Sequence, residues 1–287
     1  MTTSAMPAGF FGHGSPMNAL EHNRYTDAWR AFGTAIAPPR AVLVVSAHWY
    51  TDATAVTAMT APQTIHDFYG FPDELFALDY PAPGAPDVAE LVAETVDPRW
   101  VGLDHDSWGL DHGTWSVLIH MFPAADVPVL QLSINALKPL DHHLDIGRRL
   151  APLRDQGVLV VGSGNVVHNL GRVDWAQPAG AFDWATRFDE AARALMLEAP
   201  GDILKLAEHR DFSMAVPTPD HFIPLLYIAG VADASGSAPE VLIDGYAYGS
   251  LSMTCYTLGV EPRVEESDTA AAALPPRGTV PPDEADI

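Results

Sequence analysis

The chain has 287 residues, 48% hydrophobic and 18% charged, which is enough for one large α/β domain or two small ones with a sizeable core. Its 37 acidic and 15 basic residues give a formal net charge of −22, which disfavours contact with phosphate backbones or anionic lipid and argues against nucleic-acid and membrane partners. The single cysteine, Cys255, excludes an internal disulfide, an iron–sulfur cluster and a multi-cysteine zinc site.

The N-terminal residues carry no basic start and no apolar segment of signal-peptide length, and the apolar runs of the chain are strand-sized. We therefore expect a soluble cytoplasmic protein. Its oligomeric state is not encoded in any pattern we can read, so a monomer and a small homo-oligomer are both compatible with the sequence.

Short apolar runs alternate with longer amphipathic stretches, which is the pattern of an α/β domain. The expected strands, in chain order, are Ala8–Gly12, Ala41–Ala47, Ala55–Met59, Val127–Ser133, Val158–Gly162, Val241–Asp244 and Ser252–Leu258. The expected helices are Asn18–Phe32, Pro86–Thr95, Thr114–Met121, Leu140–Arg154, Trp184–Glu198 and Pro219–Gly230. These elements predict one domain over residues 1–260.

Two segments break the alternation. Residues 60–84 are rich in proline, glycine and aromatic side chains, and the segment is too long for an ordinary connection, so it is typical of a functional loop. Residues 261–287 combine acidic residues, alanine and proline without apolar periodicity, which predicts a disordered tail outside the fold.

Three of the twelve histidines follow expected strands at or just beyond the carboxyl end. His13 follows the first strand in FFGHGSP, His48 ends the run AVLVVSAH, and His168 comes shortly after VLVVGSGN. Ligands of open α/β sheets bind outside the carboxyl ends of the strands, and the glycines around these histidines permit tight turns. The three side chains are therefore candidates for one site.

His221 reaches the same crevice by another route. Thr218 is a favourable N-cap and Pro219 a favourable first helical residue, so we expect His221 in the first turn of a helix. The helix dipole there disfavours a protonated imidazole, and a metal ligand must be neutral.

A lone histidine after a strand is more often a hydrogen-bonded packing residue than a ligand, but four histidines in glycine- or proline-punctuated turns favour a mononuclear metal site. The metal does not follow from the ligands, since imidazoles suit both zinc and iron. Asp67, Asp111 and Asp220 are carboxylates that could bind the metal directly or orient a ligand.

Several motifs recur in a recognisable order from about Phe10 to Gly259: GHGSPMNAL, VVSAHWY, TIHDFYGFP, YPAPGAP, WGLDHGTWSVL, PVLQLSI, GSGNVVHNL, PTPDHFIPLLY and GSLSMTCY. Together they resemble the class III extradiol dioxygenases related to protocatechuate 4,5-dioxygenase, and within that family the 4,5-DOPA dioxygenase branch. The resemblance implies a central mixed β-sheet flanked by helices and a single metal at the carboxyl ends of the strands.

The resemblance also implies roles for individual histidines. His13, His48 and His221 match metal ligands, His168 matches a fourth ligand or an acid–base group, and His112 matches a catalytic position on the substrate side of the metal. In the loop TIHDFYGFP, His66 with its neighbours Asp67 and Phe68 would line the substrate pocket, although the aromatic rings of this loop could equally anchor it to the core.

The sequence departs from the protocatechuate enzymes at one ligand. Their third ligand is a glutamate, whereas the matching motif here supplies His221, as is typical of the DOPA-like branch. The site is then one negative charge short, and we expect one divalent metal, Fe(II) for dioxygenase activity or Zn(II) as bound.

The expected function is extradiol cleavage of a catecholic, DOPA-like aromatic with dioxygen as co-substrate. His168 would act as general base and later as acid, and His112 would hydrogen-bond a substrate oxygen. A zinc-dependent hydrolase that uses a metal-bound water on the same histidines is the alternative. A binding protein that has lost its metal is a third possibility, although the four histidines are all in place.

Overall fold

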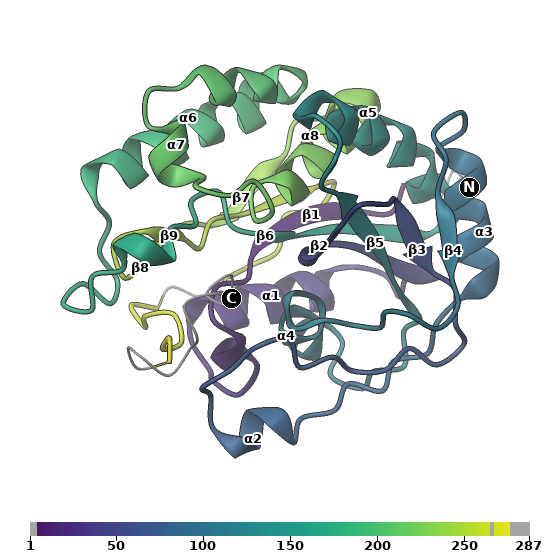
Figure 1. Ribbon diagram of the computed structural model, residues 1–287, viewed down its shortest axis with the longest axis horizontal. Helices are drawn as coiled ribbons and strands as arrows, with labels where there is room; N and C mark the ends of the chain where they lie inside the picture. The colour runs from purple at the N-terminus through teal and green to yellow at the C-terminus, as the bar shows by residue number, and fades with distance from the viewer. Residues whose placement is uncertain (1–4, 265–266, 276–287) are drawn as a thin grey trace.

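A computed structural model describes residues 5–264 and 267–275, which Figure 1 shows as a twisted sheet with helices on both faces. The eight strands of the sheet lie in the order β4-β3-β5-β2-β6-β1-β10-β7. Their bounds in that order are Gly102–Asp104, Ala55–Thr57, Val129–Asn135, Ala41–Thr51, Val158–Gly164, Ala8–Gly12, Cys255–Leu258 and Glu240–Ile243. Two further short strands, β8 and β9, pair with each other at Tyr246–Ala247 and Leu251–Ser252.

The sheet is mixed, as the resemblance implied. Strands β5, β2, β6 and β1 run parallel in its centre, whereas β3 pairs antiparallel with β5, and β10 pairs antiparallel with both β1 and β7. The central strands are continuous apolar runs because helices cover them on both faces. The carboxyl ends of β1, β2 and β6 consequently meet at one edge of the sheet.

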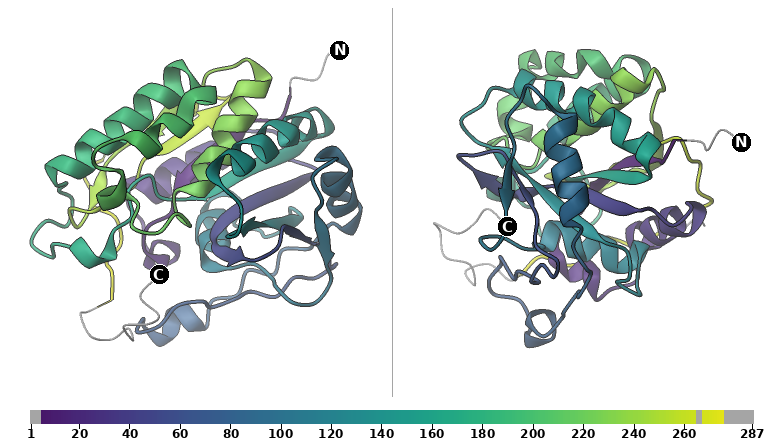
Figure 2. Two further views of the ribbon diagram at one scale, coloured as in Figure 1. Left: turned by 45° about the horizontal axis from the view of Figure 1, so that its top comes forward. Right: turned by 90° about the vertical axis from the view of Figure 1, so that its right-hand side faces the viewer.

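Two layers of helices enclose the sheet, and each packs on its own hydrophobic cluster (Figure 2). On one face lie α3 (Pro86–Thr95), α5 (Leu140–Leu150), α6 (Asp183–Glu198) and α8 (Ile223–Ser235). On the other lie α1 (Arg24–Ala35) and α4 (His112–Met121). The shorter helices are η1 (Pro16–Ala19), α2 (Asp73–Phe76), η2 (Ala151–Gln156), η3 (Leu170–Arg172), η4 (Pro200–Glu208) and α7 (Phe212–Ala215).

Strand β2 shows how side chains are divided between the two layers. Val42 and Val44 pack under α1 and α4, whereas Leu43 and Val45 point to the opposite cluster, as the two-residue period of a strand requires. The strand continues beyond its expected end at Ala47 to Thr51, with a shift of register against β5 between Val45 and Tyr50. Such irregularities re-aim side chains, and His48 lies within this one.

The predicted helix at Asn18–Phe32 is in fact two elements. Helix η1 ends at Ala19, and α1 begins only at Arg24, because the Asn23 side chain accepts hydrogen bonds from the backbone of Tyr25 and Thr26 in a capping box.

The placement of His221 in the first turn of a helix was wrong. Helix α8 begins at Ile223, and His221 lies in the turn before it. Pro224 explains the difference, because a proline fits the first turn of a helix but would break the interior of one that began at Pro219. The dipole argument for a neutral His221 therefore loses its basis.

Part of the predicted tail contacts the rest of the chain. The backbone of Ala272 donates to Asn18 and the carbonyl of Ala273 accepts from Ser15, so these residues lie against the loop that follows β1. Residues 265–266 and 276–287 lie outside the described part of the chain, and the domain boundary at 260 and the disorder of the tail stay predictions.

Within residues 5–264 and 267–275, no helix combines the length and the apolar character needed to cross a lipid bilayer.

Candidate metal centre

His13 leaves the end of β1 with its imidazole fully enclosed. Its Nδ1 lies 2.9 Å from the Ser163 hydroxyl of the neighbouring strand β6. That hydroxyl donates its own proton to the carbonyl of Gly113, so it must accept from Nδ1–H of His13. His13 is thereby fixed in the tautomer that leaves a lone pair on Nε2.

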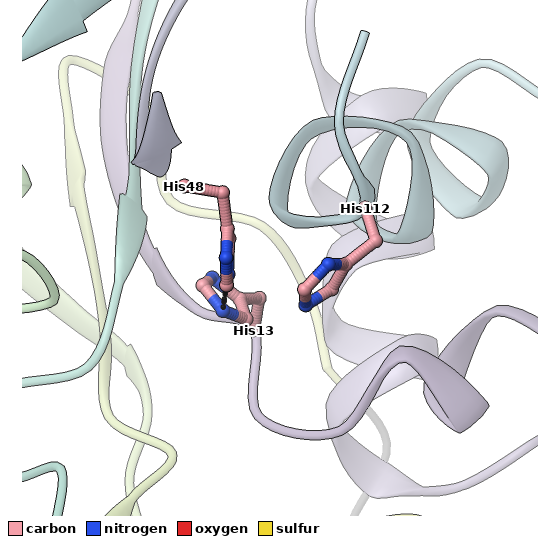
Figure 3. A group of neighbouring side chains, drawn as sticks. All are labelled: His13, His48 and His112. Carbon is pink, nitrogen blue, oxygen red and sulfur yellow. Dashed lines mark hydrogen bonds between the residues drawn. The ribbon is translucent and has the colours of Figure 1, made fainter. Parts of the chain in front are cut away.

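His48 faces His13 from strand β2 (Figure 3). The Nε2 atoms of the two imidazoles are 3.1 Å apart, and the Nδ1 atom of His48 lies 3.3 Å from the Oδ2 atom of Asp67. A carboxylate charge this close to Nδ1 of His48 favours a proton there over a lone pair, which would leave Nε2 of His48 free to bind a metal.

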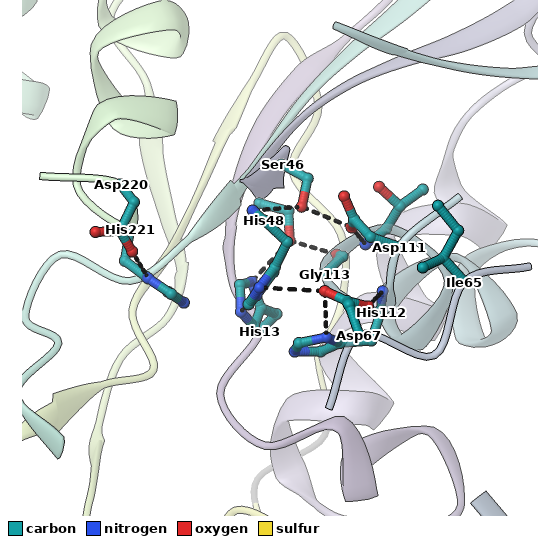
Figure 4. A network of polar contacts seen from close by, with 12 residues as sticks. His13, Ser46, His48, Ile65, Asp67, Asp111, His112, Gly113, Asp220 and His221 are labelled. Atoms are coloured by element: carbon teal, nitrogen blue, oxygen red, sulfur yellow. Dashed lines mark hydrogen bonds and ion pairs between the residues drawn. The ribbon is translucent and has the colours of Figure 1, made fainter. Parts of the chain in front are cut away.

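His112 is the first residue of α4, and Asp111 caps that helix by accepting from the backbone of Thr114. Asp111 is fully buried and is held in turn by Ser46 and Gln131, whose side chains donate to it over 2.7 and 2.6 Å. The imidazole of His112 places its Nδ1 atom 3.0 Å from Oδ2 of Asp67, the same oxygen that faces His48. Figure 4 shows these contacts converging behind the histidines.

His221 approaches from the opposite side, from the turn that precedes α8 (Figure 4). Its Nδ1 contacts the Asp220 carboxylate, which leaves Nε2 as the lone pair. Nε2 is buried and has no hydrogen-bond partner among the described residues. The end of β6 supports this turn, because the backbone amide of Asn165 donates to the carbonyl of His221. The residue before it is a glycine, Gly164, because a side chain there would collide with the same carbonyl.

Three of the imidazoles have the mutual spacing of ligands to one ion. The ring centroids of His13, His48 and His221 are 5.1, 5.3 and 5.0 Å apart. A nitrogen about 2.1 Å from a metal puts its ring centroid roughly 3.2 Å away, and two such rings at roughly 90–110° are roughly 4.6–5.3 Å apart. The His13–His48 contact between Nε2 atoms, at 3.1 Å, fits the same arrangement.

His112 is close to this set but is spaced differently. One ligand nitrogen each from His13, His48 and His112 lies within 4.8 Å of the others, so these three could also hold an ion. The ring centroids of His48 and His112 are only 3.9 Å apart, which is shorter than the separation worked out above for two imidazoles on one ion. The spacing of the rings thus favours His221 as a third ligand, whereas the spacing of the ligand nitrogens groups His112 with His13 and His48.

The imidazole nitrogens of the cluster fit a cation. The Nε2 atoms of His13 and His48 lie 3.1 Å apart, within hydrogen-bond distance of each other. Both ring nitrogens of His112 and the Nε2 atom of His221 are buried and have no hydrogen-bond partner among the described residues. Buried polar atoms are almost always paired, so these unpaired imidazole nitrogens beside His13 and His48 are compatible with a site for a divalent metal.

The electrostatics keep His13 and His48 neutral and Asp67 and Asp220 charged. Burial, and then the neighbouring His48, lower the pKa of His13 well below its ordinary value, and burial and His112 do the same to the pKa of His48. Burial raises the pKa of Asp67, but the contacts with His112 outweigh it, so this pKa falls below its usual range. The contact with His221 outweighs burial in the same way and lowers the pKa of Asp220.

The imidazole of His168 stacks face to face on that of His221. The two rings are stacked with centroids 3.6 Å apart and an interplanar angle of 1°. An imidazole binds a metal in the plane of its ring, so an ion in the plane of His221 would lie roughly 3.5 Å out of the plane of His168. This geometry disfavours His168 as a fourth ligand to the same ion and favours an acid–base role.

The loop at residues 60–84 is anchored by its aromatic residues. Phe68 is fully buried and contacts the rings of Phe71, Trp115 and His112, and His66 bonds the carbonyl of Leu78 through Nε2. Phe68 therefore acts as a wall behind His112, which agrees with the anchoring alternative for this ring. A pocket-lining role for His66 stays a prediction.

Sequence reasoning missed two residues that shape the site. Ser163 sets the tautomer of His13, and Asn18 donates to the backbone carbonyl of His13 over 2.9 Å. Ser163 lies inside the string VLVVGSG, where its direction toward β1 depends on strand order. No local pattern in the sequence identifies either residue.

A comparison with protein families matches residues 13–259 to the catalytic LigB subunit of aromatic ring-opening dioxygenase. The chain belongs to this family. The matched region begins at His13 and contains the other histidines of the centre.

Relatives within the LigB family cover almost all of the chain. The 4,5-DOPA dioxygenase extradiol of Escherichia coli (strain K12) is 47% identical over 90% of this chain and 97% of its own length. The protein of the same name from Beta vulgaris is 34% identical over 86% of this chain and 94% of its own. A crystal structure of an uncharacterized protein from Escherichia coli K12 superposes with a TM-score of 0.77 at 43% identity, covering 88% of this chain and 100% of that one.

Proposed function

We propose that this chain is an extradiol dioxygenase that opens the ring of a catechol with dioxygen, at one divalent metal held by His13, His48 and His221. The observation that carries the proposal is the near-equal spacing of the three imidazoles, 5.1, 5.3 and 5.0 Å between centroids. Membership of the LigB family supplies the reaction class.

The proposed metal is Fe(II) for catalysis, with Zn(II) as an ion the same ligands would also hold. Imidazole suits both ions, and none of the three proposed ligands is a carboxylate that would favour iron. A ferrous ion bound there would supply the electron transfer by which dioxygen reacts with a catechol.

The protein's own contribution is to place proton acceptors around the substrate. We assign His168 as the general base that takes a proton from a catechol hydroxyl and returns it in a later step. Its ring lies flat on His221, so it stays within reach of a substrate beside the metal without sharing the ion. His112 directs Nδ1 toward Asp67 and leaves Nε2 to accept a hydrogen bond from a substrate hydroxyl.

The proposed reaction inserts both atoms of dioxygen and breaks the ring carbon–carbon bond next to the diol, giving a semialdehyde with a carboxylate. A catechol carrying an amino-acid side chain is the proposed substrate, because the relatives from Escherichia coli and Beta vulgaris bear the name 4,5-DOPA dioxygenase extradiol.

A zinc hydrolase built on the same histidines is the competing function. A neutral three-histidine site would also lower the pKa of a zinc-bound water. The family match favours ring opening over hydrolysis, and the complete set of histidines argues against a protein that binds a ligand without metal.

The test is reconstitution of the metal-free protein with Fe(II) without oxygen, followed by DOPA and then air. We expect a yellow semialdehyde absorbance with iron, none with zinc, and a slower rate in His168→Ala at unchanged iron content. Stoichiometric iron with no turnover of DOPA or of other catechols would refute the proposal, and zinc-dependent cleavage of esters without oxygen would replace it with the hydrolase.

A further inference from the structure

Asp67 contacts two histidines of the centre through one oxygen atom. Its Oδ2 lies 3.0 Å from Nδ1 of His112 and 3.3 Å from Nδ1 of His48, while its Oδ1 accepts the backbone amide of His112 over 2.9 Å. One carboxylate from the loop at 60–84 thus faces a side chain on β2 and the first turn of α4 at once (Figure 4).

The loop holds this carboxylate firmly. The Ile65 amide donates to the carbonyl of Leu110 over 2.7 Å, and its carbonyl accepts from the indole of Trp115 over 2.8 Å. Phe68, on the other side of Asp67, has no solvent exposure. The backbone is therefore fixed immediately before and after the carboxylate.

We propose that Asp67 is a positioning residue that sets the tautomers of His48 and His112 together, keeping the proton on both Nδ1 atoms and a lone pair on both Nε2 atoms. This inference rests on the proposed metal site and deepens it. The negative charge of Asp67 lies 3.0 Å from Nδ1 of His112 and 3.3 Å from Nδ1 of His48, so it favours a proton on these atoms over a lone pair and leaves the other nitrogens for the metal and the substrate.

The role differs from lining the substrate pocket. The Asp67 side chain is only 17% exposed; its Oδ1 accepts the backbone amide of His112, and its Oδ2 lies beside the two imidazoles. Its negative charge also lies directly behind a proposed ligand, as does that of Asp220 behind His221. These two carboxylates would thus compensate the charge of a divalent ion held by histidines.

An asparagine at position 67 cannot reproduce this arrangement. Its amide has one oxygen, so in either orientation an N–H group faces the backbone amide of His112 or the two Nδ1 atoms. The imidazoles that meet a donor respond by moving their proton to Nε2, which then cannot bind a metal. Asp67→Asn is isosteric, so this change needs no alteration of packing.

The matched control is Asp79→Asn. Asp79 lies in the same loop, is exposed, and accepts a hydrogen bond from the Thr64 hydroxyl over 2.7 Å. It carries the same substitution and the same loss of charge, but its hydrogen-bond partner Thr64 lies within the loop, away from the histidines of the centre.

Two measurements on the full chain test the proposal, and neither uses turnover. Nitrogen-15 NMR of the histidines in the metal-free protein should show Nδ1–H for His48 and His112 in the parent and in Asp79→Asn, and a shift toward Nε2–H in Asp67→Asn. Competition with a chelator should show zinc and cobalt binding weakened about 10- to 100-fold in Asp67→Asn only.

Asp67→Ala provides a second variant, since it removes the acceptor without adding a donor and should give mixed tautomers. Parent-like tautomers and parent-like zinc affinity in both variants would overturn the role of Asp67 while leaving the metal site intact. A parent protein that binds neither ion would overturn the metal site itself, and this inference with it.

Discussion

Adding a single methyl group at Gly113 should displace a proposed metal ligand. Gly113 is the second residue of α4, and a Cβ atom built there would lie 2.8 Å from Cδ2 of His48 and 2.6 Å from the Ser46 hydroxyl. Carbon atoms in ordinary contact are about 3.5 Å apart, so in Gly113→Ala the His48 ring must recede by roughly 0.7 Å. Metal–ligand distances tolerate only about 0.2 Å.

The substitution should therefore separate metal affinity from stability. Alanine favours a helix over glycine by at most about 1 kcal/mol, and the crowding costs about 1–3 kcal/mol, so the free energy of unfolding should fall by no more than about 3 kcal/mol. We expect zinc and cobalt affinities, measured by chelator competition, to fall more than about 10-fold, with the metal-free protein still folded by circular dichroism.

Gly33→Ala is the matched control. Its Cβ would lie 2.3 Å from the carbonyl oxygen of Met121, at the other end of α4 and roughly 12 Å along the helix from Gly113. It should lower stability by a similar amount and leave metal affinity unchanged. Gly113→Ala protein that binds zinc within twofold of the parent would refute the assigned position of His48.

Three further predictions concern stability and the division of roles. Burial raises the pKa of Asp189 from 3.8 to about 6, so on lowering the pH the folded state binds this proton before the unfolded state does. The resulting stabilisation of the folded state is complete below pH about 4 and is lost as the pH rises through about 6, a difference of about 3 kcal/mol. Urea unfolding should show this change in the parent and not in Asp189→Asn. His221→Ala should abolish stoichiometric zinc binding while His168→Ala retains it, and equal losses in both would contradict the separation of ligand and base. Asn23→Ala removes the cap of α1 and should cost about 1–2 kcal/mol of unfolding free energy, with an unchanged urea midpoint counting against the capping box.

The sequence was informative where chemistry depends on strand ends. His13 follows β1 as expected, because an apolar run that stops at a glycine identifies its own carboxyl end. The expected position of His48 at the end of a strand was wrong, because β2 continues to Thr51 and the side chain lies at an irregularity within the strand.

Contacts between distant segments were beyond local reasoning. Asp67 approaches His48 and His112 only because the loop at 60–84 is anchored on α4, and Ser163 reaches His13 only because β6 pairs with β1. Helix α8 begins at Ile223 and not at the cap-like pair Thr218 and Pro219, because Pro224 cannot lie in the interior of a helix.

Isotope labelling of the product tests the central claim most directly. The Fe(II)-loaded protein would be given DOPA under ¹⁸O₂, and the ring-opened product analysed by mass spectrometry before and after exchange of its aldehyde oxygen with water. We predict that one turnover consumes one dioxygen and that both of its atoms enter the product, which His168→Ala forms more slowly than the parent. Product formed without oxygen uptake, or labelled only from water, would contradict a dioxygenase at this histidine centre.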